Sequence, residues 1–320
     1  PISFSGDVKE ELARDIDGAR HCMIAEMSAI IGMCGRVSFD EEDHVSICIQ
    51  TENVTAAKKY FTLLKKTFNI EIGVIVGRNR SLSRNRMYQL SVPEDADARK
   101  ILKTCRLMRS DHEIAEDFSL EDGSLLQREC CKRAFIRGAF LAAGSLSDPV
   151  KAYHFEIVCA TEAKALFIQS VLSALKVYSG VVARKKSYVV YVKDSSQVVE
   201  LLGLMGAHLS LMDMENVRIM KEMRNEVNRK VNCETANIQK TVTAAMKQLD
   251  DIALIKEADA FDQMPEPLQE IALLREKYPE ASLIELGKML DAPVGKSGVN
   301  HRLKKIHEIA LGICENQEGS

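Results

Sequence analysis

The sequence lacks a hydrophobic run that could cross a membrane, and its first residues lack the pattern of a secretion signal. No apolar run approaches the ~20 residues that a membrane-spanning helix needs. Residues 1–7 also lack the basic and then apolar order of a signal peptide. Of the 320 residues, 46% are hydrophobic and 28% are charged, which is typical of a globular protein with a full core. We therefore expect a cytoplasmic protein of roughly two or three domains.

The nine cysteines lack the spacing that marks zinc sites or disulfide frameworks. No C-x-x-C pair occurs, Cys130 and Cys131 are adjacent, and the others are scattered on apolar faces. Disulfide frameworks are typical of small secreted domains, and paired C-x-x-C motifs are typical of zinc sites. We therefore expect reduced, buried thiols, no bound metal and no cofactor.

The chain also lacks a strong excess of charge of either sign. Lys and Arg number 43, Asp and Glu number 46, and the formal net charge is −3. Acidic residues concentrate at 7–17, 40–43, 111–122 and 250–270, and basic residues gather elsewhere in short runs. Because the whole chain is not a polycation, any surface that binds nucleic acid must come from these local basic runs.

Two segments carry small residues at helical spacing. Ala134, Gly138 and Ala142 recur every four residues, and side chains four apart share one face of a helix. Residues 25–32 repeat this plan, and the two segments end at Gly35 and Gly144, 109 positions apart. Faces this small let two helices approach closely, because the distance between helix axes depends on the side chains in contact. We expect the two helices to pack on each other.

The duplication continues beyond these helices. Each helix leads through a short strand and a polar turn to a strand-like run that ends in Thr-Glu, at Thr51 and at Thr161. A helix, two strands and a final helix follow in each half. The later elements are expected at 54–68, 70–77, 86–92 and 95–107, and again at 163–177, 179–184, 188–193 and 194–206. The order αββαββα therefore occurs twice, in repeats of about 20–107 and 130–206, and repetition at a fixed offset is a strong architectural signal.

This order and the paired small-residue helices resemble the LAGLIDADG homing endonucleases. The resemblance implies an α+β fold of two pseudo-symmetric αββαββα units whose sheets form a saddle over DNA. Laid on the motif at residues 27–35 and 136–144, the metal-binding acids of the family fall on Cys34 and Ala143. Neither residue supplies the oxygen ligands that magnesium requires for phosphodiester cleavage. We predict that the chain is not an enzyme; an active endonuclease is the disfavoured alternative, and a plain pair of core helices is the alternative for the fold.

Two basic runs occupy equivalent hairpins of the repeats. The first run lies between the last two strands of the first repeat, and the second lies between the matching strands of the second. Basic tips at equivalent places suit a surface that faces phosphates, although scattered charge on solvated loops has the same appearance. The candidate phosphate contacts are Arg78, Arg80, Arg84, Arg86, Arg184, Lys185 and Lys186.

Residues 216–235 predict a long amphipathic helix after the repeats. Its apolar line is Ile219, Met223, Val227 and Val231. The opposite side carries recurring Asn and Arg, which either contact phosphates or form a solvated face. Candidate phosphate contacts on this helix are Arg218, Asn225 and Arg229, and the polar stripe also includes Asn228 and Asn232.

Pro265 and Pro267 mark a boundary after this helix. We predict a first domain at 1–214, linker helices at 215–264 and an all-α domain at 265–320. In the last domain the sequence predicts helices at 268–278, at 283–290 with Ser282 as N-cap and Glu285 completing a capping box, and at 298–315 with Ser297 as N-cap.

The last two helices have the plan of a helix-turn-helix over 282–315. Val299 and Leu303 begin the apolar line of the second helix, and its opposite side is basic and polar. A recognition helix enters the major groove with its N-terminal residues toward the bases. The turn at 291–297 is longer than the usual three or four residues, and a small bundle that contacts protein is the alternative. The candidate DNA-binding residues are Ser297, Asn300, His301, Arg302, Lys304 and Lys305.

The degenerate scaffold, the Arg- and Asn-rich helix and the helix-turn-helix together resemble one family, the bacterial WhiA regulators of sporulation and cell division. The resemblance covers nearly the whole chain and is most specific at residues 130–145, 223–237 and 296–306. It implies a non-catalytic, nucleoid-associated DNA-binding protein of Gram-positive bacteria, linked to transcription in sporulation, to cell division and to chromosome segregation.

We therefore expect a sequence-specific DNA-binding transcriptional regulator whose partner is double-stranded DNA. A sigma factor or another regulatory or division protein is the further partner that we consider. The alternative function is a platform that binds such a protein, with DNA contact secondary.

Overall fold

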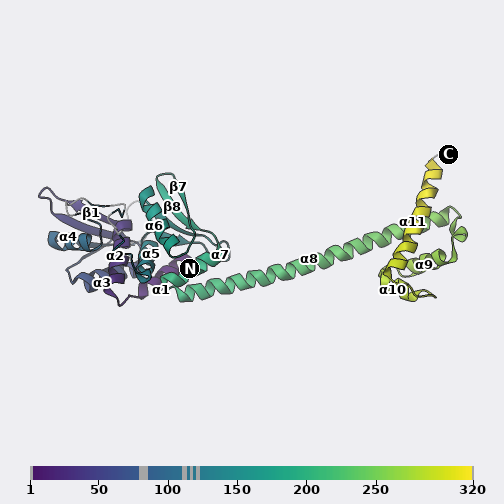
Figure 1. Ribbon diagram of the computed structural model, residues 1–320, viewed down its shortest axis with the longest axis horizontal. Helices are drawn as coiled ribbons and strands as arrows, with labels where there is room; N and C mark the ends of the chain where they lie inside the picture. The colour runs from purple at the N-terminus through teal and green to yellow at the C-terminus, as the bar shows by residue number, and fades with distance from the viewer. Residues whose placement is uncertain (1–2, 79–85, 110–113, 116–117, 120–122, 319–320) are drawn as a thin grey trace. The chain divides into compact units, whose positions relative to one another are not determined.

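The computed structural model describes residues 3–78, 86–109, 114–115, 118–119 and 123–318. By internal contacts the chain divides into two compact parts, here called the N-terminal body (Pro1–Lys221) and the C-terminal body (Glu222–Ser320) (Figure 1). The functional boundaries at 214 and 264 that the sequence suggests remain predictions.

The N-terminal body contains the predicted duplication. After α1 (Phe4–Arg14), the first repeat comprises α2 (Arg20–Cys34), β1 (Gly35–Phe39), β2 (Val45–Thr51), α3 (Val54–Phe68), β3 (Gly73–Arg78), β4 (Arg86–Val92) and α4 (Asp95–Thr104). The second comprises α5 (Glu129–Ala143), β5 (Gly144–Leu146), β6 (Phe155–Cys159), α6 (Glu162–Ala174), β7 (Gly180–Arg184), β8 (Ser187–Val192) and α7 (Ser195–Met205). The predicted fold class is confirmed.

The two antiparallel sheets have the same topology. Their strand orders are β1-β2-β4-β3 and β5-β6-β8-β7, so each position in one sheet has a counterpart in the other. Inward-facing residues of the central strands, such as Ile47, Ile49 and Ile157, are almost completely buried. Each sheet therefore packs one face on the helices of the shared core, as alternating strands require.

Helices α2 and α5 pack directly on each other (Figure 1). Ala25, Ala29 and Ala134 are completely buried, and a Cβ atom added at Gly138 would lie only 2.5 Å from the Glu26 carbonyl oxygen. No real side chain tolerates that distance without a shift of the backbone. The predicted close approach of two small-residue helices is confirmed, and it fixes the ends of both helices relative to each other.

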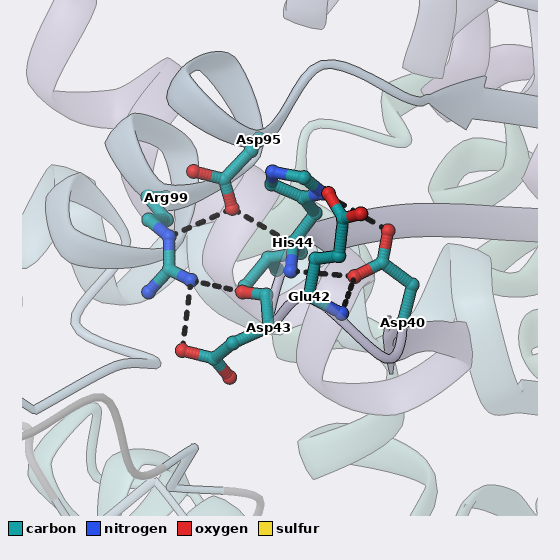
Figure 2. Close-up of polar contacts among 7 residues, drawn as sticks. Asp40, Glu42, Asp43, His44, Asp95 and Arg99 are labelled. Carbon is teal, nitrogen blue, oxygen red and sulfur yellow. Dashed lines mark hydrogen bonds and ion pairs between the residues drawn. The ribbon is translucent and has the colours of Figure 1, made fainter.

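The acidic turn between β1 and β2 ties the first sheet to α4 (Figure 2). One oxygen of Asp40 accepts a hydrogen bond from the His44 amide (2.8 Å), and Asp95, at the start of α4, accepts from the Val45 amide (2.7 Å) and from Arg99 Nε (2.7 Å). The amide of Val45 holds the pKa of Asp95 below its usual value, and Arg99 adds to the effect. The acid cluster at residues 40–43 therefore organises a turn.

Helix α8 (His208–Glu257) runs from the N-terminal body into the C-terminal body. The C-terminal body continues with η1 (Phe261–Gln263), α9 (Glu266–Lys277), α10 (Leu283–Met289) and α11 (Lys296–Glu318). Ile252 and Ile255 of α8 are completely buried in one core with Ile271, Leu286 and Val299. The last turns of α8 are therefore part of the helical domain's core.

The ends of the C-terminal helices partly differ from the predictions. The capping box at Ser282 and Glu285 is confirmed. Helix α11, however, begins at Lys296 instead of Gly298, and the carbonyl of Gly295 accepts the first amide hydrogen bonds. The predicted N-cap role of Ser297 is wrong, because this residue already lies in the first helical turn. Helix α9 also begins early, with Pro267 in its first turn, where a missing amide hydrogen costs no helical bond.

Candidate nucleic-acid interface

Helix α11 is buried along one side and exposed along the other. Val299, Leu303 and Ile306 pack in the core of the C-terminal body, against α9 and α10. This burial fixes the rotation of the helix about its own axis. The opposite side is consequently presented to solvent in a defined orientation.

The exposed side carries most of the predicted DNA-binding residues. Ser297, Asn300, His301 and Lys304 are all exposed, and their spacing places them on one face. Lys305 is exposed beside them. The structure therefore brings five of the six candidates together at the N-terminal half of α11.

Arg302 is the exception among the six. Its side chain is 20% exposed, and its Nη1 lies 3.7 Å from an oxygen of Glu270 in α9. The guanidinium therefore faces a neighbouring helix within the domain. This arrangement suits a residue that holds α11 on α9 better than one that is free to reach DNA.

A cavity of about 310 Å³ lies beside the N-terminal end of α11. Asn300 and Lys296 line it together with Lys240, from α8, and Arg275, from α9. Arg275 Nη1 donates to the carbonyls of Pro279 and Ala281, whereas its Nε is buried without a hydrogen-bond partner among the described residues. Sequence reasoning missed Lys240 because it lies 60 positions before Asn300; the only signal was its place on the predicted helix.

The basic hairpins of the N-terminal body are only partly described. Arg86 is exposed at the start of β4 and pairs in register with Arg78, whereas Arg80 and Arg84 lie outside the described residues. In the second repeat Arg184, Lys185 and Lys186 are exposed at the β7–β8 turn. Arg184 Nη1 lies 3.6 Å from Glu156, which partly offsets its charge.

The middle of α8 exposes both of its faces. Asn225 and Arg229 of the polar stripe are exposed, and Arg218 is half-buried, 3.4 Å from Glu215. The apolar line is exposed too: the fractions are 51% for Ile219, 58% for Met223, 58% for Val227 and 53% for Val231. The predicted helix is confirmed. Its apolar face is exposed to solvent, however, whereas the apolar face of an amphipathic helix normally packs against a core.

The positions of the two motif acids offer no carboxylate. Cys34 Sγ donates to the carbonyl of Ile30 (3.2 Å), and Ala143 presents a methyl group at the equivalent end of α5. Burial raises the pKa of the Cys34 thiol to about 12, against the opposing charge of Lys9. Lys164 donates to the carbonyl of Gly32 (2.9 Å). The ends of the motif helices therefore present a thiol and a methyl group, with Lys9 of α1 and Lys164 of α6 beside the end of α2.

A buried ionic cluster, also missed from the sequence, lies between the repeats. The carboxylate of Glu26 is 2.7 Å from Lys59 Nζ and 2.9 Å from Arg137 Nη2. Desolvation lowers the pKa of Lys59, whereas Glu26 acts in the opposite direction. Lys59 is thus an internal partner of α2, whereas its neighbour Lys58 is exposed. Hydropathy patterns cannot tell these two adjacent lysines apart.

Among the described residues, no helix has the length and hydropathy to span a membrane.

Comparison with known proteins identifies the family. Three family models match consecutive parts of the chain: the WhiA N-terminal LAGLIDADG-like domain at 20–108, the WhiA LAGLIDADG-like domain at 132–224 and the WhiA C-terminal HTH domain at 227–310. A probable cell division protein WhiA from Lachnoclostridium phytofermentans is 50% identical, over 98% of this chain and 99% of the relative. The relative from Clostridium beijerinckii is 44% identical, over 97% and 98%.

A solved structure agrees with this assignment. The crystal structure of full-length DUF199/WhiA from Thermatoga maritima matches with a TM-score of 0.58 and 25% identity, over 96% of this chain and 98% of that one. The match spans both bodies, and the family models cover both repeats and the helix-turn-helix. The resemblance inferred from the sequence is confirmed, and the chain belongs to the WhiA family.

Proposed function

We propose that this protein is a non-catalytic, sequence-specific DNA-binding regulator of transcription that serves cell division, chromosome segregation or sporulation and works in the cytoplasm at the nucleoid. The family's HTH domain and the cell-division names of the relatives support a DNA-binding regulator. The observation that carries the proposal is the aligned, exposed group of Asn300, His301 and Lys304 on a helix whose other side is buried.

The residues of α11 have different roles in this proposal. Asn300 and His301 lie near the N-terminal end of the helix, where base edges are within reach, and an Asn side chain can pair bidentately with adenine. Lys304 and Lys305 lie a turn further along and carry long, flexible stems that suit phosphates. The Ser297 hydroxyl, in the first turn of α11, would donate a hydrogen bond to DNA. Arg302 would act mainly by holding α11 on α9 through its ion pair with Glu270.

The remaining candidates would supply phosphate contacts without sequence information. These are Arg78, Arg80, Arg84, Arg86, Arg184, Lys185 and Lys186 at the two hairpins and Arg218, Asn225 and Arg229 on α8. Each contact contributes about −0.9 to the slope of log affinity against log salt. We retain the division into a scaffold at 1–214, a linker at 215–264 and a DNA-binding domain at 265–320 as the functional plan.

A titration of full-length variants against specific and random duplexes tests the roles on α11. Asn300→Ala should cost ~1–3 kcal/mol on the preferred site and little on random DNA. Lys304→Ala should weaken both equally and reduce the salt slope by about 1. The preferred site comes from footprinting on genomic DNA, and thermal melting of each variant controls for folding.

Either of two results would contradict this assignment. If Asn300→Ala lowered both affinities alike while Lys304→Ala altered sequence preference, the roles of bases and phosphates would be reversed. If neither variant changed binding, α11 would not read DNA.

The absence of catalysis is proposed from the ends of the motif helices. Cys34 is a neutral thiol, the side chain of Ala143 has no polar atom, and Lys164 lies at the same end of α2. None of these groups is a ligand for a hard divalent cation.

A second candidate function is favoured by the exposed apolar line of α8. In this function the chain is a platform, and a bound sigma factor or division protein would cover the apolar line of α8. Its residues are each more than half exposed: Ile219, Met223, Val227 and Val231. Charged substitutions Val227→Asp and Val231→Asp should then abolish binding to such a purified partner and leave DNA affinity unchanged. Unchanged partner binding would remove the α8 face from consideration.

A further inference from the structure

The N-terminal ends of α2 and α5 bring together four groups that commonly bind metals. They are His21, Cys22, Cys130 and Cys131, and their ligand atoms all lie within 4.8 Å of one another. His21 Nδ1 lies 3.2 Å from Cys22 Sγ, 3.3 Å from Cys131 Sγ and 4.0 Å from Cys130 Sγ. The imidazole nitrogen thus faces all three sulfurs.

The nitrogen–sulfur separations are close to those around a single tetrahedral ion, and the sulfur atoms, which lie within 4.8 Å of one another, would close to roughly 3.8 Å around it. Zinc binds sulfur at about 2.3 Å and nitrogen at about 2.0–2.1 Å, so the edges of a Cys₃His tetrahedron measure roughly 3.5–3.8 Å. The nitrogen–sulfur distances lie around this range and need shifts of only a few tenths of an ångström. Three thiolates and an imidazole are soft and borderline ligands, which select zinc over magnesium or calcium.

The four groups obey the symmetry of the duplication. His21 and Cys130 are 109 positions apart, as are Cys22 and Cys131, and the same offset separates Gly35 from Gly144. Each repeat therefore contributes two ligands from the second and third residues of its motif helix. An ion at this point would connect the two repeats across their junction.

The surroundings suit a thiolate-bound cation. Cys22 and Cys131 are buried, and a thiolate away from water needs a positive charge beside it. A metal ion would supply that charge, because a coordinating thiol loses its proton. The amide groups at the starts of both helices also favour negative charge. Cys130 is exposed, which leaves a route by which an ion could reach the group.

One contact would have to change when an ion binds. Arg128 Nη1 lies 3.2 Å from His21 Nε2. Coordination through Nδ1 leaves the proton on Nε2, so the guanidinium could no longer donate to that atom. Arg128 is exposed and can turn toward solvent, where its charge still offsets the excess negative charge of three thiolates and one zinc ion.

We propose that His21, Cys22, Cys130 and Cys131 form a structural zinc site that joins the two repeats at the N-terminal ends of α2 and α5. Four protein ligands leave no open position for substrate, so the ion would stabilise the scaffold. This proposal replaces the expectation of no metal drawn from the sequence, and it does not depend on how α11 binds DNA.

Metal analysis of the full-length chain tests the proposal. The protein, freed of any histidine tag and purified under reducing conditions without chelator, should contain about one zinc ion per chain. The variant Cys130→Ser/Cys131→Ser should lose this zinc. Cys233→Ser, which removes an exposed thiol on α8, is the matched control and should retain it.

Cobalt provides a second measurement that does not depend on the double variant folding. Wild-type protein stripped of zinc and titrated with CoCl₂ should develop the intense ligand-field bands of tetrahedral cobalt and a thiolate-to-cobalt charge-transfer band, saturating at one ion. His21→Ala should weaken cobalt binding at least tenfold while leaving a charge-transfer band from the remaining thiolates.

Three results would overturn the proposal. These are a wild-type chain that holds no zinc and shows no charge-transfer band, a folded double variant that retains its zinc, and a disulfide that joins Cys22 to Cys130 or Cys131 even in protein purified under reducing conditions. The last result would assign the cysteines to redox chemistry.

Discussion

The two ends of the α2–α5 pair differ in the chemistry they present. At the C-terminal ends, where the motif helices lead into β1 and β5, the acid positions of the scaffold are occupied by Cys34 and Ala143. At the N-terminal ends, the side chains of His21, Cys22, Cys130 and Cys131 converge. The side chains of Cys34 and Ala143 offer no carboxylate oxygen at one end, and the other end gathers the soft ligands of the proposed structural ion.

The middle of the pair explains how the ends can differ. There the helices touch through Gly138 and the completely buried Ala25, Ala29 and Ala134, and Glu26 holds Arg137 across the interface. These contacts fix both ends in place whatever side chains the ends carry. The difference therefore teaches that separate residues set the packing of the two helices and the chemistry at their ends.

The largest expected effect follows from disturbing this middle. In Gly138→Leu, the first added carbon would lie 2.5 Å from the Glu26 carbonyl oxygen, so the helices would have to separate. Overpacking costs ~1–3 kcal/mol and sometimes more, against a total stability of roughly 5–15 kcal/mol. We expect little soluble protein and a strongly lowered melting temperature, with a smaller loss for Ala142→Leu, which is half-buried.

Gly312→Leu is the matched control for this experiment. Gly312 also lies within a helix, but a Cβ added there meets no atom within 4 Å. Its melting temperature should stay the same or rise, since replacing a helical Gly gains ~0.5–1 kcal/mol. Equal melting of Gly138→Leu and wild type would show that the two helices do not meet as described, and the comparison of their ends would lose its basis.

Much of this scaffold could be predicted from the sequence because the signals are local or repeated. The repeats are visible in the recurrence of Gly35 at Gly144, 109 positions on, and of the Thr-Glu pair at Thr51 and Thr161, 110 positions apart, and the capping box at Ser282 marks the start of α10. The apolar line through Val299 and Leu303 predicted the buried side of α11, and with it the exposed residues opposite.

The rest depends on contacts between distant parts of the chain. His21 and Cys130 come together only when α2 packs on α5, and adjacent ligands do not have the C-x-x-C spacing of familiar zinc sites. The ion pair of Arg302 with Glu270 likewise requires the orientation of α11 on α9. Ser297 is a good N-cap residue by type, yet α11 already begins at Lys296, where the Gly295 carbonyl accepts the first amide hydrogen bonds.

An intermediate effect on stability is expected when thiols at either end of the α2–α5 pair are replaced by hydroxyl groups. Cys34→Ser should change stability by less than ~1 kcal/mol, because a hydroxyl group can still donate to the Ile30 carbonyl. Cys130→Ser/Cys131→Ser should lower the melting temperature by several degrees. A strong zinc chelator should lower the melting temperatures of wild type and Cys34→Ser alike and leave the double variant unchanged. If Cys34→Ser were the more damaging change, the stabilising end of the pair would have been assigned wrongly.

The smallest expected effect concerns DNA cleavage at the C-terminal ends of α2 and α5, where we predict none. Incubated with supercoiled plasmid and genomic DNA in magnesium or manganese, the purified chain should leave the DNA intact, because Cys34 and Ala143 supply no oxygen ligands. The variant Cys34→Asp/Ala143→Asp should also be inactive, since Lys9 lies near position 34 and Lys164 binds the Gly32 carbonyl, and their charges oppose a divalent cation. Cleavage by the wild-type chain that a chelator abolishes would contradict the non-catalytic proposal. Cleavage by the double variant alone would mean that only the two acids separate this end from a nuclease.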